Sequence, residues 1–295
     1  MVVAATGFFD GVHRGHRAVI ERVLLYAKAD GGASGIITFW PHPRAVLQQD
    51  AKRFRLLTTL GEKVDMLKQM GIDEVEVLAF DRDFAGQSSE EFFKFIVQKY
   101  GVRKLIMGYD HRVGSDVERT QQETAEIAKR VGLECETVGP LTDERGIIIS
   151  SSKIRKALSE GEIEEANGML GYKYALKGVV VEGNMIGRSI GFPTANMELY
   201  EPLKLLPSYG VYAVEVGVNG KRYRGITNVG SRPTVDSENK RTIETHILEF
   251  DEDIYGLSLS IEFIERMRDI VKFPSLEALA EQLRKDKEQR GMSGY

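Results

Sequence analysis

The hydrophobic residues of the first 150 positions follow two alternating patterns. Short, almost continuously apolar runs are separated by longer stretches in which apolar residues recur at helical spacing. The apolar runs predict strands over Val2–Thr6, Gly35–Phe39, Glu74–Leu78, Lys104–Met107 and Glu134–Val138. The stretches between them predict helices over Gly15–Ala29, Leu60–Met70, Ser89–Lys99 and Gln121–Val131. This alternation is typical of a parallel sheet with helices on both faces, in which ligands bind beyond the carboxyl ends of the strands.

From about Tyr174 onward the apolar segments become shorter, often alternate with polar residues, and are separated by Gly, Asn or Pro. They predict strands over Gly178–Glu182, Gly210–Val218, Lys221–Val229, Ile243–Leu248 and Ser258–Ile264. Asn219 and Gly220 lie between two of these segments and indicate a hairpin, because both residues tolerate positive φ. This half of the chain is therefore predicted to be a small antiparallel barrel.

Two further helical segments complete the pattern. Apolar spacing over Ser275–Arg290 predicts an amphipathic C-terminal helix with Ser275 as its N-cap. Another helical segment, Ser152–Leu170, connects the two halves. A length of 295 residues suits two domains, which are expected at 1–168 and 172–295. The expected fold class is α/β plus β: a parallel-sheet domain followed by a small antiparallel barrel and a C-terminal helix.

Composition and charge exclude several classes of partner. Lys plus Arg number 40 and Asp plus Glu number 44, which gives a net charge of −4. Residues 1–171 contain 23 basic and 26 acidic groups, and residues 172–295 contain 17 and 18, so neither half has the basic excess of a nucleic-acid binder. The single cysteine, Cys135, can form no internal disulfide, which indicates a reducing cytosol. Because no run reaches ~18 apolar residues and the first residues lack a secretory n-region, we expect a cytoplasmic protein without membrane contact.

The first candidate site is the string Gly7–His16, which follows the first predicted strand and opens the first helix. Its glycines allow the backbone to approach an anion closely, and a helix N-terminus offers unpaired N–H groups and the positive end of a dipole. His13 and His16 are three residues apart and therefore share a helical face. Two imidazoles at this place suit a polyphosphate whose charge rises during reaction. The alternative is a pair of surface histidines in a turn.

A second candidate element is Ile149–Arg155, where a strand end is followed by three serines and then by a basic residue. Serines at the start of a helix are commonly only caps. Here they lie at the opposite end of the same predicted domain from the His-x-Gly-His string. The combination favours Ser150, Ser151 and Arg155 as contacts on the far side of a bound nucleotide.

The third candidate site is the string Gly187–Asn196 in the predicted barrel. Thr194 and Asn196 can offer hydroxyl and carbonyl oxygens to Mg²⁺ and to phosphate, since hard cations prefer oxygen ligands. The alternative is a polar turn stabilised by Pro193. Glu244, which Thr242 and Thr245 flank, reads by itself as an exposed strand residue.

The H-x-G-H and I-S-S-S-x-x-R strings resemble the nucleotidylyltransferase superfamily. The longer string G-x-F-D-G-V-H-x-G-H resembles the FMN adenylyltransferase module of prokaryotic bifunctional FAD synthetases, as do the runs Phe39–Arg44 and Gly108–Asp110. The resemblance implies a Rossmann-type domain in which the FMN phosphate attacks the α-phosphorus of ATP in line and releases pyrophosphate. His13 and His16 would stabilise charge on the phosphates, and Asp110 would lie by the adenosine. The implied ATP and phosphate contacts are Gly7, Phe9, Asp10, Gly11, His13, Gly15, His16, Asp110, Ser150, Ser151 and Arg155.

One segment departs from that resemblance. His111 and Val113 stand where the family usually has two aromatic residues, and the following loop is acidic instead of Gly-rich and basic. Any flavin or adenine stacking by those two rings is absent from this sequence. Two interpretations of His111 remain open: a third phosphate or ribose contact, or a structural histidine.

The string G-R-x-x-G-F-P-T-A-N resembles the signature of riboflavin kinase, whose fold is a small β-barrel. Similar blocks are Tyr209–Tyr212, Asn228–Thr234, Glu244–Gly256 and Phe263–Phe273, although Ile270 and Val271 stand where that family commonly has charged residues. The resemblance implies that Glu244 is the general base for the ribityl 5′-hydroxyl. The implied ATP and phosphate contacts are Gly183, Gly187, Arg188, Gly191, Pro193, Thr194 and Asn196. The implied flavin contacts are Asn228, Arg232, Glu244 and Arg268.

Two sets of motifs in this order predict one enzyme with two activities. Riboflavin and ATP would give FMN and ADP in the second domain, and FMN and ATP would give FAD and pyrophosphate in the first, each step with Mg²⁺. A nucleotidylyltransferase of another phosphate ester with a flavin-binding regulatory domain is one alternative. A non-catalytic sensor of flavin or nucleotide is the other. Product analysis after incubation with riboflavin, ATP and Mg²⁺ separates the three hypotheses.

Overall fold

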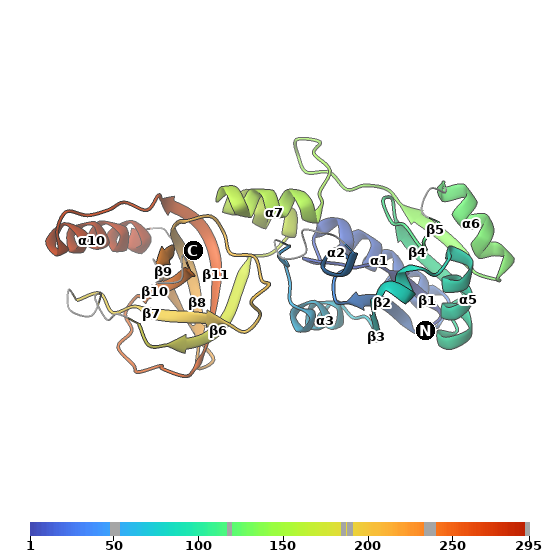
Figure 1. Ribbon diagram of the computed structural model, residues 1–295, viewed down its shortest axis with the longest axis horizontal. Helices are drawn as coiled ribbons and strands as arrows, with labels where there is room; N and C mark the ends of the chain where they lie inside the picture. The colour runs from blue at the N-terminus through green and yellow to red at the C-terminus, as the bar shows by residue number, and fades with distance from the viewer. Residues whose placement is uncertain (48–53, 117–119, 184–186, 188–190, 233–239, 293–295) are drawn as a thin grey trace. The chain divides into compact units, whose positions relative to one another are not determined.

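The protein is described by a computed structural model, in two compact units that comprise Met1–Ser151 and Ser152–Tyr295. The structure describes residues 1–47, 54–116, 120–183, 187, 191–232 and 240–292. Each unit has its own sheet and its own buried core (Figure 1).

The N-terminal unit is built on a five-stranded parallel sheet. Its strands are β1 (Val3–Thr6), β2 (Ser34–Trp40), β3 (Glu74–Ala79), β4 (Lys104–Gly108) and β5 (Glu134–Val138), in the order β3-β2-β1-β4-β5. All four strand pairs are parallel. All five strands predicted from the apolar runs are confirmed, with bounds within one residue at each end.

Helices cover both faces of this sheet, as the alternating pattern predicts. They are α1 (Arg14–Ala29), α2 (Pro43–Leu47), α3 (Leu60–Gln69), α4 (Arg82–Ala85), α5 (Ser89–Tyr100) and α6 (Gln121–Arg130). Successive β1 side chains point to opposite faces: Val3 and Ala5 pack with α1 and α3, and Ala4 packs with α5 and α6. The sequence patterns missed α2 and α4, which are too short for a helical period to show.

Helices α3, α5 and α6 start at capping boxes that the sequence encodes. In each box a Thr or Ser side chain accepts from the backbone N–H of a Glu three residues on, and the Glu side chain accepts from the backbone N–H of the cap. The three pairs are Thr59 with Glu62, Ser88 with Glu91, and Thr120 with Glu123. The reciprocal bonds fix where each helix begins, and therefore the length of the loop that follows the preceding strand.

The C-terminal unit is a closed barrel of six strands in the order β10-β7-β6-β11-β8-β9, and every pair is antiparallel. The strands are β6 (Ala175–Val181), β7 (Ala195–Leu199), β8 (Gly210–Val218), β9 (Lys221–Arg232), β10 (Lys240–Ile247) and β11 (Ser258–Arg268). Asn219 and Gly220 join β8 to β9 with φ values of 51° and 72°, so the predicted hairpin is confirmed. The sequence patterns did not single out β7, which has only five residues and a polar face.

The prediction of a single helical segment over Ser152–Leu170 is wrong in one respect, because the segment forms two helices. Helix α7 (Ser151–Glu160) ends at Gly161, whose φ of 84° lies in the left-handed region, and α8 (Ile163–Leu170) follows. The predicted C-terminal helix is α10 (Leu276–Met292). The hydroxyl of Ser275 accepts from the backbone N–H of Ala278 at 3.3 Å, which confirms its capping role.

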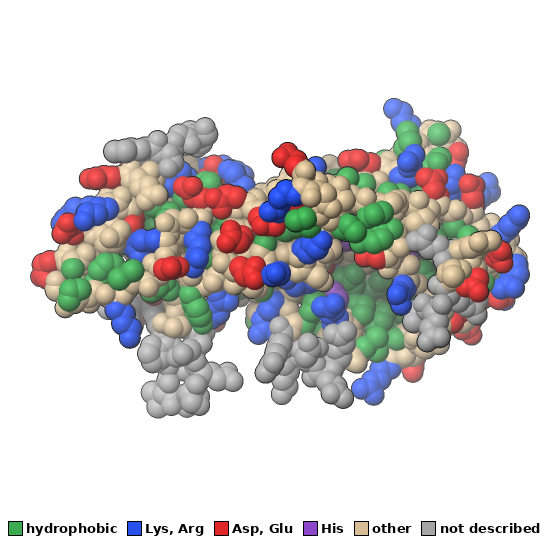
Figure 2. All heavy atoms as spheres, turned by 90° about the horizontal axis from the view of Figure 1, so that it is seen from above, with side chains coloured by type: hydrophobic (Ala, Val, Ile, Leu, Met, Phe, Trp, Pro, Cys, Tyr) green, Lys and Arg blue, Asp and Glu red, His purple; other side chains and the backbone are tan. Residues whose placement is uncertain are grey.

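Charges of both signs are interspersed over one face of the molecule. Figure 2 shows Lys and Arg side chains beside Asp and Glu side chains on the face drawn, in keeping with the net charge of −4. The same view shows a hollow in the N-terminal unit where hydrophobic side chains gather, with a histidine beside it. This distribution fits small charged ligands held in local sites better than a long polyanion.

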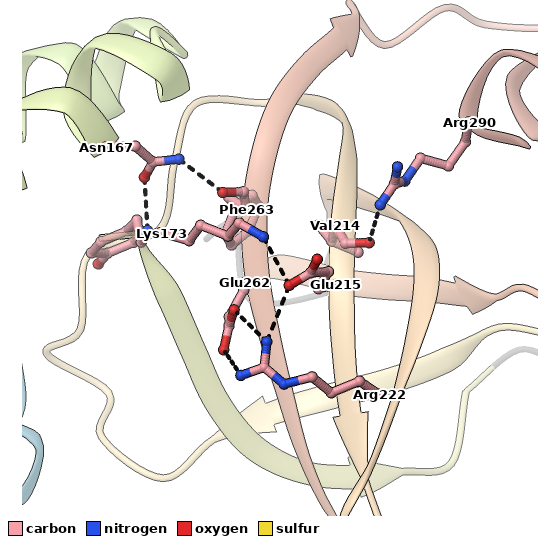
Figure 3. A network of polar contacts seen from close by, with 9 residues as sticks. Asn167, Lys173, Val214, Glu215, Arg222, Glu262, Phe263 and Arg290 are labelled. Carbon is pink, nitrogen blue, oxygen red and sulfur yellow. Dashed lines mark hydrogen bonds and ion pairs between the residues drawn. The ribbon is translucent and has the colours of Figure 1, made fainter. Parts of the chain in front are cut away.

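Polar contacts attach α8 and α10 to the barrel wall (Figure 3). Asn167 of α8 donates to the carbonyl of Phe263 at 2.9 Å and accepts from the backbone N–H of Tyr174 at 2.7 Å. Arg290 of α10 donates to the carbonyl of Val214 on β8 at 3.4 Å. These contacts satisfy backbone groups where helix and strand meet, so both helices are parts of the C-terminal unit.

Candidate active sites

The N-terminal candidate site lies at the carboxyl ends of β1 and β4. The chain runs from β1 outward to β2 and β3 and then returns to β4 on the other side of β1. The gap between β1 and β4 is therefore the switch point of the sheet, where α/β folds bind ligands. The loop Gly7–His13 follows β1, and Tyr109 and Asp110 follow β4, so two of the predicted motifs meet at this edge.

The loop Gly7–His13 has an unusual backbone. Phe9, Gly11 and Val12 have φ values of 50°, 87° and 36°. Left-handed conformations cost a β-branched residue such as Val12 about 1–3 kcal/mol, and they persist only where the surroundings impose them. Val12 is fully buried, so packing contributes to holding it there. Such stored strain is typical of loops that bring their backbone N–H groups to a ligand.

Asp10 holds this loop in place. Its carboxylate, which is 3% exposed, accepts from the backbone N–H of Leu57 at 3.0 Å and from that of Thr58 at 2.9 Å. The hydroxyl of Thr58 in turn accepts from the N–H of Gly11 at 3.0 Å. The sequence motif pointed to Asp10 as a phosphate contact, whereas the structure gives its carboxylate a positioning role within the loop.

A buried lysine lies beneath the same loop. The ammonium of Lys63, 2% exposed, donates to the carbonyl of Phe8 at 3.0 Å and to the hydroxyl of Thr38 at 2.9 Å, and it lies 4.3 Å from the centre of the Phe8 ring. Burial lowers the pKa of Lys63 to about 8, although the charge of Asp10 opposes this shift. Sequence patterns gave no sign of Lys63, because a lysine in a helix normally faces solvent.

His13 and His16 meet as predicted. His13 is the N-cap of α1, and its Nδ1 accepts from the backbone N–H of His16 at 3.3 Å. The two rings stack with centres 3.6 Å apart, and the His16 ring meets Phe9 edge-on at 5.3 Å. With Nδ1 accepting, the neutral His13 ring carries its proton on Nε2. A Cβ on Gly15 would lie 3.2 Å from the His13 ring, so glycine there leaves room for this imidazole.

The serine motif contacts the loop Gly7–His13, although the two lie near opposite ends of the N-terminal unit's sequence. The hydroxyl of Ser151, the first residue of α7, donates to the carbonyl of Asp10 at 2.9 Å. Two motifs 141 positions apart are thus in direct contact. Ser150 precedes Ser151 and is half-buried. Arg155 lies one turn further along α7, in the C-terminal unit, and its contact with a nucleotide stays a prediction.

A cavity of about 350 Å³ opens beside the loop Gly7–His13, at the carboxyl edge of the sheet. Its wall is mainly aromatic and includes Phe8, Phe39, Phe80, Phe84 and Phe92. Its volume lies in the range of small-molecule sites, about 300–1,000 Å³. Phe39 and Pro43 belong to the run that resembles FAD synthetases, whereas nothing in the sequence marked Phe80 or Phe84.

His111 also lines this cavity, and Asp110 beside it is exposed. Burial lowers the pKa of His111 to about 4, and the nearby charge of Asp110 compensates only in part. The imidazole is therefore neutral at pH 7 and offers a phosphate no positive charge. Of the two interpretations left open by the sequence, a charged phosphate contact does not fit this environment.

The C-terminal candidate site is a cavity of about 420 Å³ on the barrel. Gly183, Pro193, Thr194 and Asn196 from the predicted set line it. A Cβ on Gly183 would come within 2.1 Å of the Asn196 amide, so glycine is required for this close approach. Four further residues line it, and the sequence motifs give none of them a role: Phe250, Asp251, Glu252 and Asp253.

Glu244 lies in the middle of a row of three predicted residues. In the strand register it pairs with Asn196 on β7 and with Asn228 on β9. Residues directly opposite one another in antiparallel strands present their side chains on the same face. Glu244 is not among the residues that line the cavity, but it adjoins the cavity through Asn196.

His246 connects the two barrel motifs, a role that no sequence pattern indicated. Its Nδ1 lies 2.8 Å from the carbonyl of Pro193, and its ring meets Phe192 edge-on at 5.4 Å. Burial lowers the pKa of His246. The histidine two positions after Glu244 thus holds the turn that carries Thr194 and Asn196.

For the rest of the predicted barrel site, the structure describes the two glycines but not the side chains of the two arginines. Gly187 accepts from the backbone N–H of Phe192 at 2.8 Å, and Gly191 has a φ of 81°. Arg188 lies outside the described residues, and Arg232 is described only as a backbone position at the end of β9. A nucleotide contact by Arg188 and a flavin contact by Arg232 stay predictions.

Arg268, at the end of β11, is held by α10. Its guanidinium forms a bidentate pair with Asp286, with N···O distances of 2.6 and 3.0 Å. Asp286 is 2% exposed and also accepts from the side-chain amide of Gln282 at 2.9 Å. The predicted flavin contact at Arg268 is thus fixed by a buried carboxylate on the C-terminal helix.

The donor set of the barrel cavity fits a magnesium–phosphate complex. A Thr hydroxyl, an Asn carbonyl oxygen and nearby carboxylates are hard oxygen ligands, and Mg²⁺ usually binds through few protein groups together with substrate phosphates. Over the described parts of the chain, no cluster of three or more His, Cys, Asp and Glu side chains is placed to hold a metal ion. A metal at Thr194 and Asn196 would therefore bind together with the nucleotide.

The architecture and the two sites define a two-domain ATP-dependent transferase, with a nucleotidylyltransferase-like α/β unit and a barrel. The family described as FAD synthetase matches residues 1–153, and the family described as riboflavin kinase matches residues 170–292. The chain belongs to the bifunctional riboflavin kinase/FMN adenylyltransferase family.

Similar proteins extend over almost the whole chain. The bifunctional riboflavin kinase/FMN adenylyltransferase of Listeria monocytogenes is 37% identical over 286 residues, which are 97% of this chain and 90% of that protein. The protein of the same description from Escherichia coli is 34% identical over 96% of this chain and 90% of its own length. A solved structure from Streptococcus pneumoniae, described as a macrolide-efflux protein, has a TM-score of 0.91 at 33% identity and covers 99% of this chain and 94% of its own.

None of the helices in the described residues is long and apolar enough to cross a lipid bilayer.

Proposed function

We propose that the chain catalyses two consecutive steps of flavin cofactor synthesis. The barrel unit phosphorylates riboflavin with ATP to give FMN, and the α/β unit transfers the adenylyl group of ATP to FMN, which gives FAD and pyrophosphate. The observation that supports this most strongly is the presence of two separate sites. One joins Thr194 and Asn196 to a cavity next to Glu244, and the other joins the stacked pair His13 and His16 to an aromatic cavity.

In the α/β unit, the phosphates of ATP occupy the N-terminus of α1, where backbone N–H groups and the helix dipole favour anions. The Nε2–H of His13 donates to the phosphate chain, since its Nδ1 is already engaged by His16. The ring of His16, stacked on His13, faces the same phosphates and stabilises the charge that develops on the leaving pyrophosphate. Attack of the FMN phosphate on the α-phosphorus needs no covalent enzyme intermediate.

In the barrel unit, Glu244 accepts the proton of the ribityl 5′-hydroxyl as that oxygen attacks the γ-phosphorus of ATP. Thr194 and Asn196 would hold Mg²⁺ together with the nucleotide phosphates, and the metal would neutralise phosphate charge. His246 positions Thr194 and Asn196 through its bond to the Pro193 carbonyl. The register that places Glu244 beside Asn196 keeps base and metal ligand adjacent.

Small molecules are the expected partners: ATP and flavins, without nucleic acid or membrane. Charges of both signs alternate over the surface drawn in Figure 2, which offers no extended basic stripe on that face. The proposed cytoplasmic location rests on the single cysteine, Cys135, which can form no internal disulfide. It is half-buried, and burial raises its pKa to about 12, so it behaves as an inert core residue.

The direct test is chromatography of flavins after incubation with riboflavin, ATP and Mg²⁺. Both FMN and FAD should form, and an excess of a metal chelator should abolish both, because each reaction moves phosphates whose charge the protein alone does not neutralise. Restoring Mg²⁺ in the same sample is the control. FMN formation that persists in excess chelator would overturn the metal assignment to Thr194 and Asn196. Absence of both products in the presence of Mg²⁺ would overturn the proposed function.

A further inference from the structure

Two polar side chains interrupt the aromatic wall of the cavity in the N-terminal unit. Gln87 and His111 both line it. Among the described residues, Gln87 Oε1 and His111 Nε2 are buried and have no hydrogen-bond partner, and the same is true of the Thr6 hydroxyl oxygen in the same wall. Buried polar atoms are almost always paired, so three orphans in one cavity indicate a ligand that completes their hydrogen bonds.

The segments that carry these residues are fixed without any ligand. The backbone N–H of Ser115 donates to the carbonyl of Gln87 at 2.8 Å, and the hydroxyl of Ser115 donates to the carbonyl of Gly86 at 3.0 Å. Asp116 accepts from the backbone N–H of Ser89 at 2.9 Å. The acidic loop that departs from the family pattern therefore fastens the His111 segment to the start of α5, and it presents Gln87 and His111 in prearranged positions.

The chemistry of the wall specifies the kind of ligand. Five phenylalanine rings favour a flat aromatic group, while the amide and the imidazole require a group with hydrogen-bond donors and acceptors at one edge. A neutral imidazole has one donor and one acceptor nitrogen, and a carboxamide oxygen accepts. The isoalloxazine ring of FMN combines both properties. Its dimethylbenzene end is apolar, and its pyrimidine end carries an N–H between two carbonyl groups.

We propose that Gln87 and His111 hydrogen-bond the pyrimidine edge of the FMN ring and so determine which end of the ring enters the cavity. This inference rests on the proposed adenylyl transfer to FMN. It assigns His111 a role that differs from both interpretations left open by the sequence. Where relatives have an aromatic residue, this chain recognises the flavin by a polar contact.

The test compares FMN with 3-methyl-FMN, in which a methyl group replaces the N–H of the pyrimidine ring. Formation of FAD from FMN, and of its 3-methyl analogue from 3-methyl-FMN, is measured for the wild type, Gln87→Leu, His111→Phe and the double variant. Gln122→Leu, the same substitution at an exposed position of α6, is the matched control. Riboflavin phosphorylation by each variant reports on the integrity of the other unit.

The wild type and Gln122→Leu should show a KM at least about tenfold higher for 3-methyl-FMN than for FMN, because one good hydrogen bond is lost. In Gln87→Leu and in the double variant this ratio should fall below about threefold, because the amide oxygen that accepts from the ring N–H is gone. His111→Phe removes the other contact to the pyrimidine edge and should raise the KM for both flavins alike. A ratio that stays high in the double variant, or a ratio near one in the wild type, would overturn the proposal. Failure of the wild type to form FAD from FMN would instead overturn the proposed function, so the two failures are distinguishable.

Discussion

At the scale of single residues, the adenylyl-transfer site depends on polar groups that are removed from water in different ways. Asp10 and Lys63 are buried and His111 is half-buried, and the cost of removing each from water is offset in a different way. The Asp10 carboxylate is paired with backbone N–H groups, and the Lys63 ammonium is paired with a carbonyl and a hydroxyl. His111 avoids the cost of burial by staying neutral, because desolvation disfavours its charged form.

His111 should make the protein sensitive to acid. Its pKa in the folded protein is about 4, below the ordinary 6.5, so between these values the unfolded chain binds a proton that the folded chain does not. The free energy of unfolding should therefore fall as pH decreases from about 6.5 to 4, by at most about 3 kcal/mol from this residue. Thermal unfolding of wild type and His111→Phe between pH 7 and 4 checks this. Parallel pH curves for the two proteins would contradict it.

Replacing Asp10 by Asn should disable the phosphate loop. The amide nitrogen replaces one carboxylate oxygen, so the backbone N–H of Leu57 loses an acceptor 3.1 Å away, and the oxygen that still accepts from Leu57 and Thr58 is no longer charged. A bond to a charged acceptor is worth about 1.5–3 kcal/mol. FAD formation from FMN should drop at least about tenfold, while riboflavin phosphorylation stays unchanged. Asp30→Asn, at the exposed C-cap of α1, is the matched control. An Asp10→Asn variant with normal FAD formation would show that the loop needs no such anchor.

At the scale of elements, what the sequence could predict depended on length and periodicity. The long amphipathic helices, the apolar strands and the Asn219-Gly220 hairpin are local signals, and the structure confirms them. The strand β7 and the break at Gly161 were not predicted, because a five-residue strand takes its identity from its partners and one glycine can either end a helix or continue it. The helix α4, which leads into Gln87, has four residues and no detectable period.

Helix α10 should stabilise the barrel mainly through Asp286. Removing one partner of a buried ion pair leaves the other uncompensated, so Asp286→Asn should lower the free energy of unfolding by about 3 kcal/mol. It should also raise the KM for riboflavin if Arg268 contacts flavin, without changing FAD formation from supplied FMN. Glu281→Gln, which breaks an exposed pair with Lys285 on the same helix, should cost less than about 1 kcal/mol. Chemical denaturation of the two variants compares these values, and equal losses would refute the role given to Asp286.

At the scale of the whole molecule, the sequence motifs identified which residues carry chemistry but not what surrounds them. His13, His16, Ser151, Thr194, Asn196 and Glu244 were marked by motifs, and the structure brings each into a predicted neighbourhood within its own unit. The cavity linings were not predictable, since Phe80, Gln87 and Asp251 reach their cavities only through tertiary packing. Supporting residues such as Lys63 and His246 could not be predicted for the same reason.

Each unit is proposed to perform one reaction with its own residues. Two variants test it in a single assay that starts either from riboflavin or from FMN. Glu244→Gln keeps the shape of the side chain and removes its basicity, so FMN formation should fall roughly a hundredfold or more, while supplied FMN is still converted to FAD. His16→Ala should do the reverse and let FMN accumulate from riboflavin without FAD. If both folded variants lost both activities, the assignment of one reaction to each unit would be wrong.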